Sequence, residues 1–412
     1  MAGIQRIKGF ADLFSPESDA FAFMEGTARR VFSSYGYSEL RVPIMEPTEL
    51  FVRGIGTETD IVQKEMYTFP DRKGRSLTLR PEATAGVMRA YAEAGCNTRE
   101  SVSKFFTYGP MFRYERPQKG RMRQFHQINC ECVGASEPVV DAEVILMLMT
   151  FLGELGLTGL SLEINSLGCK ECRPEYRRIL GEFLAKLNPD DLCEDCRRRM
   201  SINPLRVLDC KVSSCKAQVE NAPRIAEHNC PDCTRHFTFV REVLDKTELS
   251  YVLNHRLVRG LDYYNRTTFE VVSSSIGAQG SVAGGGRYDG LVNALGGPDV
   301  PGVGFACGME RLAMMLQIPE RTPEDFYIAV LDDAALETAV LVAQQLRFAG
   351  KRGQISFAAK SLKSQMRQAS KLNVKKCLII GSNELAAEIV AVKDMATGEQ
   401  QSVSMNAITA AI

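Results

Sequence analysis

The chain has no excess of charge of either sign, because its 412 residues carry 50 Lys and Arg against 50 Asp and Glu. A nucleic-acid partner would therefore have to be met by local basic patches. Long apolar runs are also missing: the longest, Val144 to Leu152, is much shorter than the roughly 20 residues of a membrane-spanning helix. The first residues, Met1 to Arg6, lack the apolar segment of a signal peptide. We therefore expect a cytoplasmic protein with no membrane partner.

Cysteine is abundant, with thirteen residues, and without a secretory signal we expect reduced thiols or a metal site in place of disulfides. Eight of the thirteen form four close pairs: Cys169 and Cys172, Cys193 and Cys196, Cys210 and Cys215, and Cys230 and Cys233. Thiolate pairs at such spacing can hold tetrahedral zinc, and eight of them would fill two structural sites. Reduced, buried thiols without metal are the alternative, and the sequence leaves both open.

Alternation and helical spacing predict an antiparallel sheet flanked by helices, an α+β domain. Residues 16–35 and 139–155 carry apolar side chains at helical spacing, and residues 36–44 alternate up to Pro43, as expected of an edge strand. Further strands are predicted at 65–69, 76–79, 104–108, 124–133, 160–164, 252–254, 267–272 and 280–284.

Composition changes along the chain and divides it into domains. Residues 168–249 are rich in charge, helix formers and cysteine, which predicts a mainly helical insertion between two parts of the α+β domain, 1–167 and 250–318. A linker is expected at 319–324. Residues 325–412 alternate strands (327–331, 355–357, 377–380) with helices (336–349, 362–372), which predicts a small α/β domain with a mostly parallel sheet.

Two arginines occur in distinctive surroundings. Arg113 lies in Phe112-Arg113-Tyr114-Glu115-Arg116, and Arg311 lies in Gly308-Met309-Glu310-Arg311-Leu312. Guanidinium is always charged and donates in a planar fork that suits phosphate oxygens. No Gly-x-x-x-x-Gly-Lys-Ser/Thr sequence occurs, so a P-loop would not hold such a phosphate. As an ordered pair, the two segments resemble motifs 2 and 3 of class II aminoacyl-tRNA synthetases.

Four further segments resemble the same class. Residues 36–44 are similar to motif 1, whose proline, here Pro43, lies at the dimer interface, and residues 79–86 are similar to the loop that receives the amino acid's α-amino group. Residues 257–265 and 283–290 resemble the two signatures that separate histidyl-tRNA synthetases from other class II enzymes. The resemblance covers nearly the whole chain and implies a homodimer with a class II catalytic domain and a C-terminal anticodon-binding domain.

The resemblance implies a ligase that activates L-histidine with ATP to histidyl-adenylate and pyrophosphate, then transfers histidine to the 3'-terminal adenosine of its tRNA. Because the substrate carboxylate is the nucleophile, catalysis would depend on orientation and charge stabilisation. The catalytic pair implied is Arg259 and Arg113, both on the α-phosphate. Arg311 would hold the γ-phosphate and Glu115 the adenine amino group, with Mg²⁺ on the phosphates. The histidine-binding residues implied are Glu82, Thr84, Gln127, Glu131, Arg259, Tyr263 and Tyr264.

Contacts to tRNA are expected in two places. The loop after Arg113 would meet the acceptor end through Arg116, Gln118, Arg121 and Arg123, because phosphate contacts position a nucleic acid. In the last domain, Lys360, Lys363, Arg367 and Lys371 fall near one helical face, with Lys375 and Lys376 following. Such a run is usually a solvated helix face, but next to this catalytic domain it favours anticodon binding.

Two other functions compete with this interpretation. Synthetase-like chains also serve as regulatory subunits of ATP phosphoribosyltransferase, but those lack the anticodon domain and depart from the signature at 259–264. A zinc-dependent nucleic-acid-binding module would explain the cysteine-rich insertion only, and it leaves Arg113 and Arg311 without a role. Histidine-dependent exchange of pyrophosphate with ATP distinguishes the three.

Overall fold

An eight-stranded sheet is the centre of the first of two units, Met1–Ile318 and Pro319–Ile412. The computed structural model describes residues 3–317 and 322–412, so the linker expected at 319–324 lies partly outside the described residues. The strands follow the order β1 (Ser38–Glu39), β5 (Ser103–Phe112), β6 (Gln124–Val133), β11 (Gly302–Gly308), β10 (Ser281–Arg287), β9 (Asn265–Ser273), β7 (Leu160–Ser166) and β8 (Val252–Leu253). The five inner pairings are antiparallel and the two outermost are parallel.

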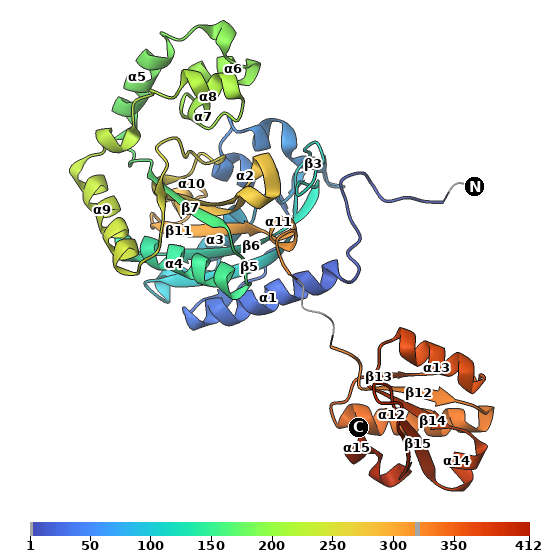
Figure 1. Ribbon diagram of the computed structural model, residues 1–412. Coiled ribbons are helices and arrows are strands. Elements are labelled where there is room, and N and C mark those ends of the chain that lie inside the picture. The colour runs from blue at the N-terminus through green and yellow to red at the C-terminus, as the bar shows by residue number, and fades with distance from the viewer. Residues whose placement is uncertain (1–2, 318–321) are drawn as a thin grey trace. The chain divides into compact units, whose positions relative to one another are not determined.

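Three helices cover one face of this sheet: α1 (Glu17–Ser34), α4 (Pro138–Glu154) and α9 (Pro231–Lys246) (Figure 1). Helical spacing places Phe21, Met24 and Phe32 of α1 on the buried side. Along β6 the side chains alternate, so that Ile128, Cys130 and Cys132 join the same core. The other residues of β6 therefore point to the opposite face, where the cleft described below lies.

The opposite face carries shorter elements. These are α2 (Thr48–Ile55), a π-helical turn (Ile61–Glu65), α3 (Thr84–Glu93), α10 (Leu291–Ala294) and a three-stranded sheet of β2 (Met45–Pro47), β4 (Ser76–Leu79) and β3 (Tyr67–Pro70). Helix α11 (Met309–Ala313) follows β11 and packs Met309 and Leu312 into the core shared with α1 and α4. Among the described residues, no helix is long and apolar enough to cross a membrane.

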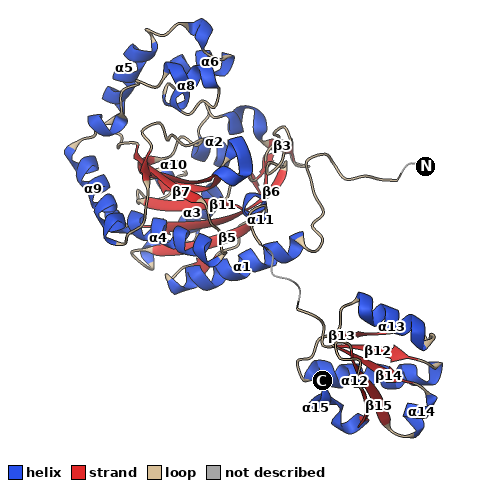
Figure 2. Cartoon of the chain, in the orientation of Figure 1, coloured by secondary structure: helices blue, strands red, loops and turns tan. Residues whose placement is uncertain are grey.

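The cysteine-rich segment forms a group of helices between β7 and β8 (Figures 1 and 2): α5 (Arg173–Leu184), α6 (Glu194–Ile202), α7 (Leu205–Leu208), α8 (Ser213–Gln218) and finally α9. It contains no strand in the described residues 168–249. Its buried apolar residues, including Tyr176, Leu180 and Val207, form one cluster with residues of the sheet unit such as Val258 and Tyr264. The insertion is therefore packed into the first unit.

The second unit has a five-stranded sheet in the order β13 (Gly353–Ile355), β12 (Phe326–Val330), β14 (Lys376–Ile380), β15 (Ile389–Asp394) and β16 (Gln400–Ser404). Its helices are α12 (Leu336–Phe348), α13 (Leu362–Lys371), α14 (Ser382–Ala386) and α15 (Ile408–Ala411). The expected alternation of strand and helix is present up to β14. The expectation of a mostly parallel sheet is wrong, because β14, β15 and β16 pair antiparallel.

The strand expected at residues 36–44 is much shorter than expected. Only Ser38–Glu39 pairs, parallel to Phe105 and Phe106 of β5, and it lies at the edge of the sheet. Pro43 has no N–H to donate to a ladder, which is consistent with the early end of the strand. The chain then leaves the large sheet and enters β2 of the small one.

A buried ion pair joins the helices to the sheet. The Arg287 guanidinium of β10 donates to both carboxylate oxygens of Asp141 in α4, and both side chains are fully buried. His236 of α9 contacts the same carboxylate at 3.0 Å between Nε2 and Oδ1. Burial opposes the charge of Asp141, but hydrogen bonds and attraction from His236 and Arg287 hold its pKa below the usual value. Asp141 therefore links α4, α9 and β10.

We predict that Asp141→Ala destabilises the first unit by about 3 kcal/mol, because it removes the fully buried partner of the Arg287 guanidinium and leaves that buried charge only the partly exposed Asp289 as a charged partner. Urea unfolding followed by circular dichroism measures the change. Glu182→Ala is the matched control, since it removes a carboxylate from an exposed ion pair with Arg178 and should barely move the midpoint. Equal midpoints for the two variants would contradict the role given to Asp141.

Candidate active site

A cleft of about 1000 Å³ opens on the face of the large sheet away from α1 and α4. All ten residues that the sequence predicted to bind histidine and ATP line it: Glu82, Thr84, Arg113, Glu115, Gln127, Glu131, Arg259, Tyr263, Tyr264 and Arg311. They come from the loop before α3, from β6 and the loop preceding it, from the segment before β9 and from α11. Positions 230 residues apart in the chain thus meet in one cavity.

Strand register forms the floor of the cleft. Asn129 of β6 lies opposite Ala306 of β11, which lies opposite Gly284 of β10, followed by Glu270 of β9 and Glu163 of β7. All five line the cleft. The middle of this row has almost no side chains, with carboxylates at one end and an amide at the other. The small residues leave room above the sheet for a ligand.

The Arg259 guanidinium lies over Gly284. Its Nη1 donates to Glu270 Oε1 at 2.9 Å, and its carbon atom Cζ lies 5.9 Å from the centre of the Tyr264 ring. Burial opposes the charge, but attraction to Glu270 raises the pKa of Arg259 above its ordinary value. Its Nε is buried without a hydrogen-bond partner among the described residues. Arg259 is thus held in place by one carboxylate while a donor is left for a ligand.

Glu131 is the most deeply buried carboxyl group of the cleft and is 1% exposed. Thr84 Oγ1 donates to its Oε1 at 2.7 Å, and Tyr288 donates from its hydroxyl to Oε2 at 2.5 Å. Burial raises the pKa of Glu131 to about 8, and these two hydroxyl groups oppose the rise. Gly304, opposite Glu131 on β11, makes the site possible, because a Cβ there would lie 2.0 Å from Oε2.

Glu82 lies beside this group at the start of α3. Its two carboxylate oxygens accept the backbone N–H groups of Thr84 and Ala85 at 2.8 and 2.9 Å, as a helix cap does. Burial raises the pKa of Glu82. The rings of Tyr263 and Tyr264 pack against each other at 4.7 Å between centres. Gln127 Oε1 is buried without a partner among the described residues, which leaves an acceptor for a ligand.

Arg113 and Arg311 add positive charge to the cleft. Arg113 Nε donates to the Pro81 carbonyl at 2.9 Å, and its guanidinium lies 5.2 Å from the centre of the Phe125 ring. Arg311 Nε donates to the Gly120 carbonyl at 3.2 Å. Burial, with repulsion from Arg121, lowers the pKa of Arg311. An anion such as a phosphate, bound beside Arg311 and Arg121, would relieve the repulsion between them.

The four residues predicted for the tRNA acceptor end lie in the loop between β5 and β6, in two different settings. Arg116 and Gln118 are exposed. Arg121 pairs with Glu115 at 2.8 Å, and the Arg123 guanidinium lies 4.0 Å from the centre of the Tyr114 ring. Arg121 also lines the cleft, whereas the other three do not. Their contact with tRNA stays a prediction.

Sequence reasoning missed several residues of the cleft. Tyr288 was part of a recognised segment but had no role, and Glu270 was inside a predicted strand without further comment. Alternation along β9 could have placed Glu270 on the face of its polar neighbours, but only strand register brings it to Arg259. The insertion also contributes Arg199, Arg206 and Lys211 to the lining, which no local pattern indicates.

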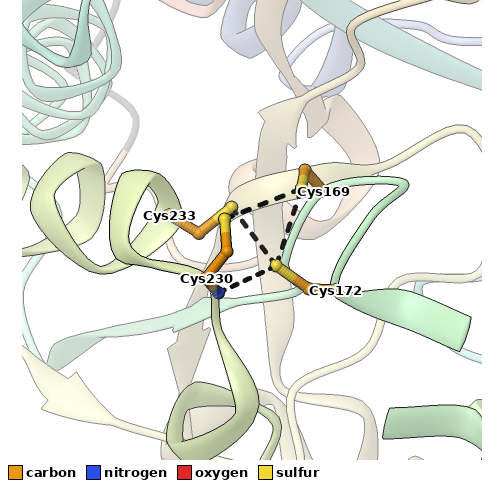
Figure 3. A group of neighbouring side chains, drawn as sticks. All are labelled: Cys169, Cys172, Cys230 and Cys233. Carbon is orange, nitrogen blue, oxygen red and sulfur yellow. Dashed lines mark hydrogen bonds between the residues drawn. The ribbon is translucent and has the colours of Figure 1, made fainter. Parts of the chain in front are cut away.

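The eight paired cysteines come together in two groups of four. One contains Cys169, Cys172, Cys230 and Cys233 (Figure 3), and the other contains Cys193, Cys196, Cys210 and Cys215. Within each group the Sγ atoms all lie within 4.8 Å of one another. All thirteen cysteines are free thiols in the structure.

Comparisons with known proteins agree on one family. The family model for Histidyl-tRNA synthetase matches residues 9–312, and that for Anticodon binding domain matches residues 325–412. The Histidine--tRNA ligase of Nitratidesulfovibrio vulgaris is 66% identical, over 100% of this chain and 98% of its own. That of Oleidesulfovibrio alaskensis is 64% identical, over 100% of both chains.

Solved structures agree with these relatives. The apo histidyl-tRNA synthetase of S. aureus has a TM-score of 0.81 and 33% identity, over 100% of this chain and 99% of that chain. An ATP phosphoribosyltransferase regulatory subunit/histidyl-tRNA synthetase from Bacillus halodurans, at 19% identity and a TM-score of 0.67, shares the fold alone.

The antiparallel sheet with flanking helices, the arginine-lined cleft and the separate C-terminal domain define a class II aminoacyl-tRNA synthetase. Within that class, the chain belongs to the histidyl-tRNA synthetase family.

We predict that Gly284→Ala lowers the turnover of histidine-dependent pyrophosphate exchange about a hundredfold, the usual cost of one lost charge-stabilising donor. A Cβ at this position would lie 2.5 Å from both Nη atoms of Arg259, so the flexible guanidinium must move away. The fold should survive because the side chain can yield. Gly26→Ala, with nothing within 4 Å, is the control. Full turnover in the Gly284 variant would show that the place of Arg259 is unimportant.

Proposed function

We propose that the cleft binds histidine beside Glu82 and Glu131 and binds ATP beside Arg113 and Arg311, and that histidyl-adenylate forms where the two substrates meet. As a member of this family, the chain joins histidine to tRNA with ATP. The observation that carries the assignment of the site is the convergence of all ten expected residues on one cleft. The competing regulatory function is disfavoured, because the anticodon-binding model matches residues 325–412.

Arg259 and Arg113 act on the α-phosphate in this proposal. The histidine carboxylate attacks phosphorus and pyrophosphate leaves, so negative charge grows on the equatorial oxygens. The two guanidinium groups are fixed beforehand, Arg259 by Glu270 and Arg113 by the Pro81 carbonyl. Donors fixed before the reaction stabilise the transition state without reorganising. Arg311 takes the γ-phosphate, and Glu115 accepts from the adenine amino group.

Mg²⁺ enters as part of the nucleotide substrate. The Glu270 carboxylate lines the cleft and is the kind of oxygen donor that Mg²⁺ takes alongside phosphates. An ion bound with the nucleotide would neutralise charge on the leaving pyrophosphate. Zinc is proposed only as a structural metal of the insertion, with no part in the reaction.

Histidine is selected by groups that read its imidazole and its α-amino group. Glu131 accepts from one ring N–H and Tyr264 reads the other nitrogen, while Glu82, Thr84, Gln127 and Tyr263 receive the α-amino end. A buried polar pocket rejects analogues without matching donors, because its own groups would be left unpaired. The buried Gln127 Oε1 without a partner supports this role.

The tRNA contacts both units in this proposal. Arg116 and Gln118 are exposed and free to meet the acceptor end. In the second unit Lys360, Lys363, Arg367 and Lys371 are exposed on or next to α13. Phe357, 90% exposed between β13 and α13, offers a ring for stacking an unpaired base. Lys375 and Lys376 are less available, since they bind Asp325 and the Ala411 carbonyl.

The chain works as a homodimer in this proposal, in the cytoplasm. Ile44, Met45 and Phe69 are 44, 45 and 41% exposed on and beside the small sheet of β2, β4 and β3, directly after Pro43. Exposed apolar side chains of this kind suit burial at a two-fold interface. Sedimentation at activity-assay concentrations tests it, and a fully active monomer would contradict it.

Pyrophosphate exchange with each amino acid in turn tests the function. Exchange should require histidine, and the purified chain should charge the histidine tRNA and no other. Exchange with a different amino acid, or none with histidine, would overturn the assignment.

We predict that histidine binds more tightly as the pH rises through about 8, the pKa of Glu131. The raised pKa keeps the carboxyl neutral below this value, and ionisation above it creates the acceptor for an imidazole N–H. Glu131→Gln should lose this dependence, while retaining any that comes from the ligand's own amino group. Calorimetric titration of both proteins gives the ratio of the dissociation constants, and a ratio independent of pH would contradict the role of Glu131.

We predict that removing residues 325–412 leaves histidine-dependent exchange measurable and abolishes efficient charging of tRNA. Every residue proposed for histidine and ATP lies in the first unit, which is compact by itself. Phosphate contacts by the α13 lysines should also make charging by the full chain sensitive to salt. The ratio of the two activities is the informative quantity. Equal loss of both in a folded truncated chain would mean that the second unit serves only as a support.

A further inference from the structure

The two groups of four cysteines have the dimensions of metal sites. A tetrahedron of thiolates around zinc, with bonds of about 2.3 Å, places its sulfurs about 3.8 Å apart. In the first group, the Sγ distances are 3.5 Å for Cys169–Cys172, 4.0 Å for Cys169–Cys230 and 3.8 Å for Cys172–Cys233 (Figure 3). In the second group, Cys193 and Cys210 are 3.8 Å apart. A disulfide would need about 2.05 Å.

Backbone N–H groups also point at the sulfurs. The N–H of Cys230 donates to Cys172 Sγ at 3.0 Å, and that of Cys193 donates to Cys215 Sγ at 3.1 Å. Such donors stabilise the negative charge of a thiolate ligand. Each group has two deeply buried members, since Cys172, Cys233, Cys196 and Cys215 are at most 5% exposed. Without a metal, the four sulfurs of each group would contact one another with no bond between them.

The two groups of cysteines lie at different places in the insertion. Cys169 and Cys172 lie where the chain leaves β7, and Cys230 and Cys233 lie where it returns in the first turn of α9. The first group therefore closes the neck of the insertion. Cys193 and Cys196 begin α6, while Cys210 and Cys215 lie on either side of the start of α8. The second group therefore ties together the small helices at the head.

Neck and head contact the same short segment of the active site, residues 259–264. From the neck, Arg173 donates to the Tyr264 carbonyl. From the head, Arg206 Nη1 donates to the Arg259 carbonyl at 2.7 Å, and Asn203 Nδ2 donates to Asp262 Oδ1 at 2.9 Å. The segment that carries Arg259, Tyr263 and Tyr264 is thus held at both ends by side chains of the insertion.

The helices of the head are short. Helices α7 and α8 have four and six residues, far below the about 12–15 at which an isolated helix is even marginally stable. A metal bound only by the folded state contributes its binding free energy to folding. Four ligands from α6, α8 and the turn between α7 and α8 would fix Asn203 and Arg206, which lie between Cys196 and Cys210 in the chain.

We propose that each group of four cysteines binds one Zn²⁺ and that the two ions hold the insertion so that Arg173, Asn203 and Arg206 fix the 259–264 segment. The three are positioning residues for the reaction assigned to the cleft, so this part rests on the proposed function. The metal sites themselves do not depend on it. Zinc acts here at a distance from the reacting atoms, as a closed structural site does.

Metal content of the purified full chain tests the sites directly. Mass spectrometry of the metals should find two zinc ions per chain, matching the two groups. Cys172→Ser with Cys233→Ser should retain one, as should Cys196→Ser with Cys215→Ser. Cys96→Ser, outside both groups, is the control and should retain both. Equal zinc in all four proteins, or none in the unaltered chain, would overturn the proposal.

Cobalt loading covers the case in which a double variant does not fold. Two equivalents of Co²⁺ added to the metal-depleted, unaltered chain should give the intense sulfur-to-cobalt absorption of tetrahedral thiolate sites. Absence of that absorption, in a chain whose thirteen thiols all titrate as reduced after denaturation, would overturn the sites without any variant.

The positioning role has its own measurement. Arg206→Ala should retain two zinc ions and lower the turnover of pyrophosphate exchange about tenfold, with a smaller change in the Michaelis constant for ATP. Arg206→Lys, which can still donate to the Arg259 carbonyl, should recover part of the loss. Unchanged turnover in Arg206→Ala would overturn the positioning role. Two zinc ions in a chain without histidine-dependent exchange would instead reject the proposed function and leave the metal sites standing.

Discussion

The ion pair between Glu270 and the Arg259 guanidinium, which lies over Gly284, is the constraint on which the rest of the first unit depends. A permanent cation must stay at the base of a cleft without filling it. Glu270 fixes it from a neighbouring strand, and Gly284 gives it space. That arrangement needs β9, β10 and β11 in one register, because one residue of slip would turn each side chain to the opposite face. The network of Asp141, Arg287 and His236 fixes β10 against α4 and α9 from the other side.

The cleft carries both signs of charge. Arg113, Arg259 and Arg311 line it, and the carboxyl groups of Glu82 and Glu131 are buried in it. The two carboxyl groups have raised pKa values because they are buried, and hydroxyl and backbone donors only partly compensate. A ligand with negative charge beside the arginines and N–H donors beside Glu82 and Glu131 would satisfy both the arginines and the buried carboxyl groups. Histidine joined to a phosphate has that pattern, which is why the adenylate fits the function that we propose for the cleft.

Much of this could be predicted from the sequence, and the missing part has a physical cause. Residues such as Arg113 and Arg259 occur in contiguous segments whose composition is specific to their chemistry, so they were found. Strands with clear alternation, such as β4 and β6, were predicted with their bounds. The strands β15 and β16 were missed, which made the second sheet seem mostly parallel. Glu270 and Arg206 were missed as site residues because their partners are fixed by register and packing between distant segments.

The cysteines illustrate the same limit and show what the insertion contributes. Spacing predicts four pairs, but four pairs can combine into two groups in three ways. The structure joins the outermost pairs with each other and the inner pairs with each other, so that a neck and a head result. An insertion held only at its neck could swing as a body. The contacts of Arg199 with Asp60 and of Asn203 with Asp262 add a second attachment at the head. Because side chains of the insertion line the cleft, the insertion forms a third side of it, and Arg206 of the insertion holds the Arg259 carbonyl.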